Sequence, residues 1–143
     1  PPKHHLADPA LSARLLGATG ASLLAGDDAE RLGKGPLVGN LFESLVTLSI
    51  RVYAQAAEAR VGHLRTFSGE REIDLVVERA DGRVVGIEVK LGGTVDEADV
   101  KHLLWLQQEL GKDVVDMLVV TTGPRAYRRP DGIAVVPLAL LGP

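Results

Sequence analysis

Cysteine is absent from the 143-residue chain, which excludes disulfide bonds and thiolate metal sites and fits a reducing cytoplasm. Aromatic side chains are also scarce, at 3 % of residues, whereas hydrophobic residues together make up 45 %. A core therefore has to be built mainly from Leu, Val, Ile and Ala. No apolar run approaches the roughly 18 residues that suggest a membrane span, so no membrane partner is expected.

Positive charge is not in excess, because the formal net charge is −3. A global basic field that would draw the molecule onto nucleic acid is thereby excluded, and any nucleic-acid contact has to be local. The length suits one domain. Since the chain does not begin with Met, we expect it to be part of a longer protein.

Residues 71–90 carry the clearest structural signal in the chain. Alternating side chains occupy residues 73–78 and again residues 85–90, which is the period-2 pattern of a β-strand. Asp81 and Gly82 stand between the two segments, and this dipeptide favours a tight turn. The sequence therefore predicts a β-hairpin.

The length of the turn decides which residues face each other across the hairpin. A two-residue loop would place Leu75 opposite Glu88, whereas a three-residue loop with a left-handed Gly82 places Asp74 opposite Glu88. We predict the longer loop, because it gathers the apolar residues of both strands on one face. That face is formed by Ile73, Leu75, Val77, Val85, Ile87 and Val89, and the other face carries Asp74, Glu88 and Lys90.

Asp74, Glu88 and Lys90 together suit the metal-assisted hydrolysis of a phosphodiester. Two opposed carboxylates repel each other unless a cation lies between them, and Mg²⁺ binds one or two carboxylates while it retains several waters. The ammonium group of Lys90 can polarise a metal-bound water or stabilise a developing negative charge. The alternative interpretation is an amphipathic strand on which Glu88 and Lys90 are ordinary exposed residues.

The N-terminal part of the chain predicts short helices. Residues 1–34 are expected to form a helical lead-in, with one helix starting at Asp8 as N-cap and Pro9 at the first helical position. Residues 21–24 and 27–32 are two further short helical segments. Residues 35–143 are expected to form one globular unit.

The remaining segments predict an α/β fold with a mixed sheet of about five strands flanked by helices. Apolar residues at helical spacing indicate a long helix over residues 36–59, with Glu43 at the border of its buried side. A second helix is predicted from a cap at residues 94–96 to about Leu110. Further strands are expected over residues 61–67, 114–120 and 133–136, and a loop over residues 122–132.

Four motifs follow one another along the chain, and each occurs once. They are Lys3 to Leu16, Gly39 to Val46 (Gly-Asn-Leu-Phe-Glu-Ser-Leu-Val), Glu72 to Val77 (Glu-Ile-Asp-Leu-Val-Val) and Ile87 to Lys90 (Ile-Glu-Val-Lys). Their order and spacing resemble the PD-(D/E)XK restriction-endonuclease-like core. More narrowly, the chain resembles the C-terminal domain of unknown function (domain of unknown function 4143) that follows an AAA-type ATPase module in many bacterial and archaeal predicted ATPases.

This resemblance implies a restriction-endonuclease-like three-layer core, an upstream ATPase module in the full-length protein and, for an active enzyme, Mg²⁺ or Mn²⁺. It implies that Asp74, Glu88 and the helix carboxylate Glu43 hold the metal and that Lys90 assists the attacking water. Ile73 replaces the proline that often precedes the first acid. Because the family has no settled activity, the alternative is an inactive interaction or regulatory domain that binds a partner or forms a homo-oligomer through its helices.

Basic residues outside these motifs are candidates for local nucleic-acid contacts. His63 and Arg65 lie on the strand before the hairpin, and an aromatic side chain with nearby arginines occurs in the predicted loop over residues 122–132. The arginines of that loop are Arg125, Arg128 and Arg129. A strand edge and a solvated loop are the ordinary interpretations of these residues.

Overall fold

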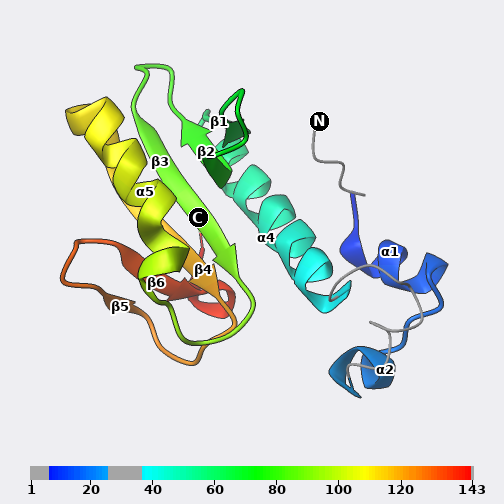
Figure 1. Ribbon diagram of the computed structural model, residues 1–143. Coiled ribbons are helices and arrows are strands. Elements are labelled where there is room, and N and C mark those ends of the chain that lie inside the picture. Colours follow the sequence, from blue (N-terminus) through cyan, green and yellow to red (C-terminus); the bar gives the residue numbers. More distant parts are fainter. Residues whose placement is uncertain (1–6, 26–36, 143) are drawn as a thin grey trace. The chain divides into compact units, whose positions relative to one another are not determined.

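The computed structural model of the chain describes residues 7–25 and 37–142 (Figure 1). The chain divides into two compact units, Pro1–Ser49 and Ile50–Pro143, which are described separately. The helix predicted over residues 27–32 lies outside the described residues. Within the described ranges, no helix combines the length and the apolar character that a membrane span requires.

The first unit contains the helices α1 (Pro9–Leu15) and α2 (Gly20–Ala25) and the beginning of α4 (Leu37–Ala56). The predicted start of α1 is confirmed, because the carboxylate of Asp8 accepts a hydrogen bond from the Ala10 N–H at 2.8 Å. This cap satisfies one of the backbone donors that a helix N-terminus leaves open.

The second unit is built on one mixed sheet, whose strand order is β1-β2-β3-β4-β6-β5. Neighbouring strands are antiparallel at both ends of the sheet, whereas β3, β4 and β6 run parallel. The helix α5 (Glu97–Leu110) connects β3 to β4, as a parallel pair requires. The strands are β1 (Arg60–Arg65), β2 (Glu72–Glu78), β3 (Val84–Lys90), β4 (Val114–Thr121), β5 (Tyr127–Arg128) and β6 (Ala134–Pro137), and the 3₁₀ turns η1 (Gly111–Asp113) and η2 (Leu138–Leu140) follow α5 and β6.

The predicted α/β fold with a mixed sheet and flanking helices is confirmed, but the sheet has six strands rather than about five. The additional strand, β5, lies inside the segment predicted as a loop over residues 122–132. It forms because a tight turn folds the chain back along β6: the Arg129 N–H donates to the Ile133 carbonyl at 2.9 Å, and Gly132 adopts a φ of +88°. The Asp131-Gly132 dipeptide is the sequence signal for this hairpin.

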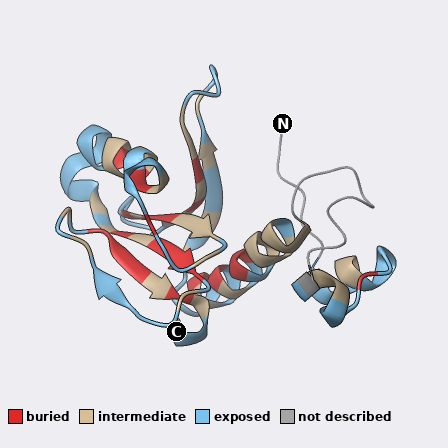
Figure 2. Cartoon of the chain, turned by 60° about the horizontal axis from the view of Figure 1, so that its bottom comes forward, coloured by how far each residue is buried: buried red, intermediate tan, exposed pale blue. Residues whose placement is uncertain are grey.

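One face of the sheet packs against α5. Gly111, with a φ of +54°, ends this helix as predicted, and Val100, Leu103 and Leu106 form its buried side (Figure 2). Residues of the helix, of four strands and of the connecting loops form one buried cluster: Ile73, Val84, Val95, Val100, Leu103, Leu106, Met117, Val119, Ile133 and Val135. The buried core between the helix and the sheet therefore consists of apolar side chains without an aromatic residue.

The opposite face is covered by the part of α4 that belongs to the second unit. Ile50 and Ala54 are buried there, as are Leu75, Ile87 and Val120, whose side chains alternate away from α5 along their strands. Tyr53 ties this helix to the end of the chain, because its hydroxyl donates to the Leu141 carbonyl at 3.2 Å. The sheet of the second unit is thus apolar on both faces.

Gly86 offers a test of how closely α5 approaches the sheet. A Cβ at this position would lie 2.9 Å from a methyl group of Leu103 and 2.9 Å from one of Leu106. We expect Gly86→Ala to lower the free energy of unfolding by about 1–3 kcal/mol, because the packed methyl groups would have to move. Urea unfolding measures the loss. Gly62→Ala, on β1 with no atom within 4 Å of the added methyl, is the matched control, and an equal loss in both variants would contradict the packing argument.

Candidate functional site

The β2–β3 hairpin has the predicted register. The Arg79 N–H donates to the Arg83 carbonyl at 3.0 Å, and Gly82 has a φ of +81°, so the loop contains three residues. Leu75 pairs with Ile87 in the resulting ladder. The pairing ends there, and the next residues along the two strands are Asp74 and Glu88.

Asp81 stabilises this turn through its carboxylate. The carboxylate accepts hydrogen bonds from the N–H of Arg83 at 3.1 Å and from the guanidinium Nε of the same residue at 2.9 Å. These two bonds lower the pKa of Asp81, so the turn is held by an ionised side chain. The ionised Asp81 therefore reinforces the turn that sets the register of the hairpin.

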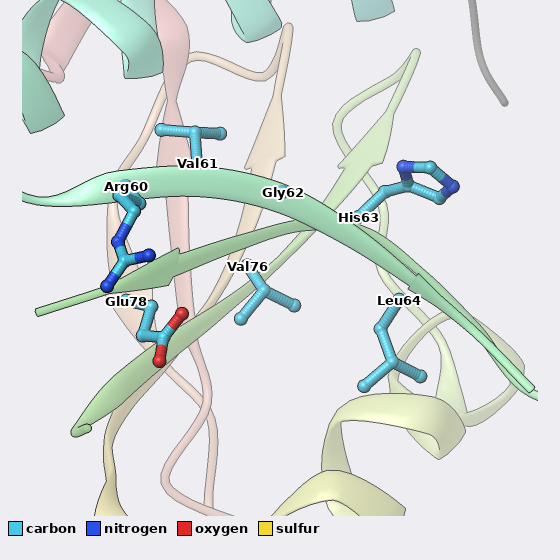
Figure 3. A pocket seen from close by; sticks show the side chains of 7 residues that line it. All are labelled: Arg60, Val61, Gly62, His63, Leu64, Val76 and Glu78. Atoms are coloured by element: carbon cyan, nitrogen blue, oxygen red, sulfur yellow. The ribbon is translucent and has the colours of Figure 1, made fainter.

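An extra residue in β2 interrupts its pairing with β1 beside the candidate site. Gly62 pairs with Val76 and Leu64 with Ile73, so Asp74 and Leu75 together face one residue of β1, His63. Figure 3 shows Leu64 and Val76 pointing to the side of α5 and His63 pointing to the other side.

This bulge corrects one detail of the predicted hairpin. Ile73 was expected to share a face with Leu75, but it belongs to the cluster around α5, together with Leu64 and Val76. The alternation of side chains reverses across Asp74 and Leu75, because two residues of β2 occupy the space of one.

Asp74 lies where the β2–β3 ladder ends. Hydrogen-bonded pairs alternate along an antiparallel ladder, so the pairs 79/83, 77/85 and 75/87 predict that the Val89 N–H bonds to the carbonyl of residue 73. The carboxylate of Asp74 accepts this N–H instead, at 3.0 Å. One side-chain oxygen of Asp74 thus takes the place of a backbone carbonyl at the point where the two strands separate.

Glu88 and Lys90 follow on β3. By alternation from Gly86, which touches α5, both side chains leave the strand on the side that α5 covers. Glu88 lies next to Val119 of β4 and Lys90 next to Thr121, and both are intermediate in exposure. The two predicted acids therefore directly follow the last pair of the ladder, with the predicted lysine two residues beyond Glu88.

Lys90 is engaged by a carboxylate that the sequence did not single out. Its ammonium group forms an ion pair with Asp99 on the first turn of α5. The hydrogen bond to Asp99 raises the pKa of Lys90, so this lysine is protonated at neutral pH. Burial raises the pKa of Asp99, but the bonds from Lys90 and from the Asp96 N–H outweigh burial and lower it overall.

Asp99 serves two functions at the start of α5. Its second carboxylate oxygen accepts the N–H of Asp96, whose own side chain accepts the N–H of Asp99, and this reciprocal pair is a capping box. Two acids three residues apart before an apolar run predict such a box from the sequence. The additional contact with Lys90 depends on tertiary structure, so spacing alone does not predict it.

Glu43, the third predicted metal ligand, lies on α4 in the first unit. Helical spacing places it on the same side of the helix as Val46, Thr47 and Ile50, which are buried. Its participation in the site stays a prediction, since the two units are described separately. Among residues 7–25 and 37–142, no three or more His, Cys, Asp or Glu side chains form a group that could hold a metal ion.

Two of the candidate nucleic-acid contacts lie on β1. His63 is exposed, whereas Arg65 has its Nε 3.9 Å from the carboxylate of Glu72. A pocket of about 340 Å³ lies along the same strand (Figure 3). Its lining includes His63, Leu64 and Glu78 but none of the predicted metal ligands. The pocket is therefore separate from the candidate metal site.

The three arginines of residues 122–132 differ in their contacts. Arg128 binds the carboxylate of Asp116 through both terminal nitrogens, at 2.9 and 3.0 Å. Arg129 bonds to Asp131 and to the Val95 carbonyl. These two guanidinium groups stabilise the β5–β6 hairpin. Arg125 is exposed and makes no ion pair with the described residues, which leaves it as the candidate for an external anion.

The Lys90–Asp99 ion pair predicts a specific dependence of stability on pH. Because the pKa of Asp99 is lower in the folded chain than in the unfolded chain, its contribution is present above the unfolded pKa and is lost as the pH falls through the folded pKa. We expect Asp99→Asn, which keeps an oxygen for the cap, to lower the free energy of unfolding at pH 7 by about 1 kcal/mol.

Urea unfolding between pH 7 and pH 2 measures this effect. The acid-side loss of stability should be smaller in Asp99→Asn than in the wild type. Asp113→Asn, at an exposed position in η1, is the control and should retain the wild-type profile. Identical pH profiles for the wild type and Asp99→Asn would show that the ion pair contributes nothing.

Comparison with known proteins assigns the chain to a family. No curated protein shows significant similarity to it. The family model described as "Domain of unknown function (DUF4143)" matches residues 38–141, from the second residue of α4 to the residue after η2. The resemblance to domain of unknown function 4143 is thus confirmed, whereas the upstream ATPase module stays a prediction, and α1 and α2 lie outside the match. The chain belongs to the DUF4143 family.

Proposed function

We propose that this DUF4143 domain is a nuclease of the PD-(D/E)XK type that hydrolyses phosphodiesters with Mg²⁺ or Mn²⁺. The observation that supports the proposal is the register of the β2–β3 hairpin. Its last pair is Leu75 and Ile87, and the next residues along the two strands are Asp74 and Glu88, with Lys90 two residues further on β3. Acids and an amine at facing strand positions are the arrangement that such hydrolysis needs.

Asp74 and Glu88 fit a hard divalent cation. Mg²⁺ prefers oxygen ligands and is held by one or two carboxylates and several waters, so two acids are sufficient. The carboxylate of Asp74 also accepts a hydrogen bond from the Val89 N–H. When bound, the cation supplies Lewis acidity and an activated water.

Lys90 contributes a fixed positive charge. Its ammonium group has three N–H donors, and Asp99 uses only one of them. The ion pair therefore keeps Lys90 protonated and limits its motion, while two donors are available for a phosphate oxygen or an attacking water. Given the net charge of −3, contacts with the remaining nucleic-acid backbone would be local, and Arg125 and Arg65 are the proposed sites.

The second candidate is a non-catalytic interaction domain attached to an AAA-type ATPase module of the same full-length protein. The Lys90–Asp99 ion pair favours it, because the pair also explains the lysine as a structural contact between β3 and α5. In either case we propose a cytoplasmic location, which suits a chain without cysteine.

Metal binding separates the two candidates. We expect saturating Mn²⁺ at about 100 times its Kd to stabilise the wild type by about 2.7 kcal/mol and to raise the Tm by roughly 5–10 °C. Asp74→Asn and Glu88→Gln should lose this shift, whereas Asp113→Asn should keep it. An equal shift in all four proteins would locate the metal elsewhere and contradict the proposed site.

Cleavage is the second test. Nicking of supercoiled plasmid DNA and degradation of single-stranded DNA and RNA should require Mg²⁺ or Mn²⁺. Lys90→Ala should lower the rate by roughly 10²–10³-fold, because it removes a preorganised charge at the reacting group. A wild type that binds metal at Asp74 and Glu88 but cleaves none of these substrates would support the interaction domain.

A further inference from the structure

The solvent side of α4 carries a row of large aliphatic residues. Leu45, Leu48 and Val52 are 41, 37 and 55 % exposed, and Leu41 precedes them at helical spacing with intermediate exposure. The opposite side of the same helix carries the buried residues Val46, Ile50 and Ala54. An amphipathic helix normally presents polar residues to water. The helix α4 therefore exposes apolar side chains that its packing against the described residues does not bury.

The spacing of this row is that of a coiled-coil seam. Residues 41, 45, 48 and 52 are separated by four, three and four positions, which places them at alternating d and a positions of a heptad. All four belong to one continuous helix, and the row is roughly 17 Å long at 1.5 Å per residue. The charged residues of α4, Glu43 and Arg51, lie outside it. The surface therefore fits an uncharged helical partner with the same spacing.

We propose that this seam pairs with α4 of a second copy of the chain in an antiparallel, two-fold symmetric arrangement. The seam is self-complementary: about an axis between Leu45 and Leu48, each of these residues meets the other in the second copy, and Leu41 meets Val52. Every layer is then apolar, as a symmetric interface between identical patches requires. The pairing does not depend on the proposed metal chemistry.

Charge and chain direction favour the antiparallel orientation. Arg51 flanks the seam and would lie beside Ser44 of the second copy, so no like charges are brought together. The two helix dipoles also oppose each other.

The helix α1 fits the seam less well than a second α4. It has seven residues, about 10 Å of helix, and presents Leu11 and Leu15 at helical spacing, so it matches two of the four layers. The seam alone is smaller than a standard interface of about 1,600 Å². We therefore expect a reversible dimer that dissociates on dilution.

Sedimentation equilibrium over a range of protein concentrations tests the dimer. The wild-type mass should rise from monomer to dimer, and the double variant Leu45→Gln/Leu48→Gln should raise the dissociation constant at least tenfold. Leu110→Gln is the matched control, because Leu110 is a helical leucine that is 42 % exposed on α5. Circular dichroism and thermal unfolding check that each variant is folded. A wild type that is monomeric at every concentration, or an equal loss in the control, would overturn the proposal.

The absence of cysteine allows a test of the orientation. Under mild oxidation, a mixture of Leu41→Cys and Val52→Cys proteins should form the mixed disulfide. Leu41→Cys alone should not cross-link, because the two copies of residue 41 are separated by roughly 16 Å along the antiparallel pair, beyond the 7 Å limit for a disulfide. A disulfide between two Leu41→Cys chains without the mixed product would overturn the antiparallel arrangement.

Discussion

The backbone hydrogen bond from Arg79 to Arg83 fixes the register of β2 and β3, and the candidate site depends on that register. It closes a loop of three residues, in which only Gly82 adopts a left-handed conformation. Asp81 reinforces the turn with two bonds to Arg83. From there the ladder continues to Leu75 and Ile87, and Asp74 and Glu88 follow directly on the two strands.

Features determined by neighbouring residues were predictable from the sequence. The hairpin loop, the Asp8 cap and the end of α5 at Gly111 each depend on a few adjacent side chains, and all three are confirmed. The same signal, Asp131-Gly132, marks the β5–β6 hairpin. It was interpreted as a loop because Tyr127–Arg128 is too short to show the alternation of a strand.

Features that depend on distant segments were not predictable in this way. The bulge at Asp74 and Leu75 arises from pairing with β1, and no local pattern distinguishes it from a regular strand. The Lys90–Asp99 contact joins a strand to a helix nine residues later, so its geometry depends on how α5 packs on Gly86. The sequence thus identified the acids and the lysine of the candidate site, whereas their immediate partners required the fold.

The capping box of α5 has a consequence for how the molecule responds to change. Asp99 holds the first turn of α5 and the side chain of Lys90 with the same carboxylate, one oxygen for each. Fraying of that turn would release the lysine, and withdrawal of the lysine by an incoming anion would loosen the turn. Local unfolding of the first turn of α5 and movement of the Lys90 side chain are therefore linked equilibria. Amide hydrogen exchange at Asp96 and Asp99 would then report on changes at Lys90, although neither amide belongs to the lysine.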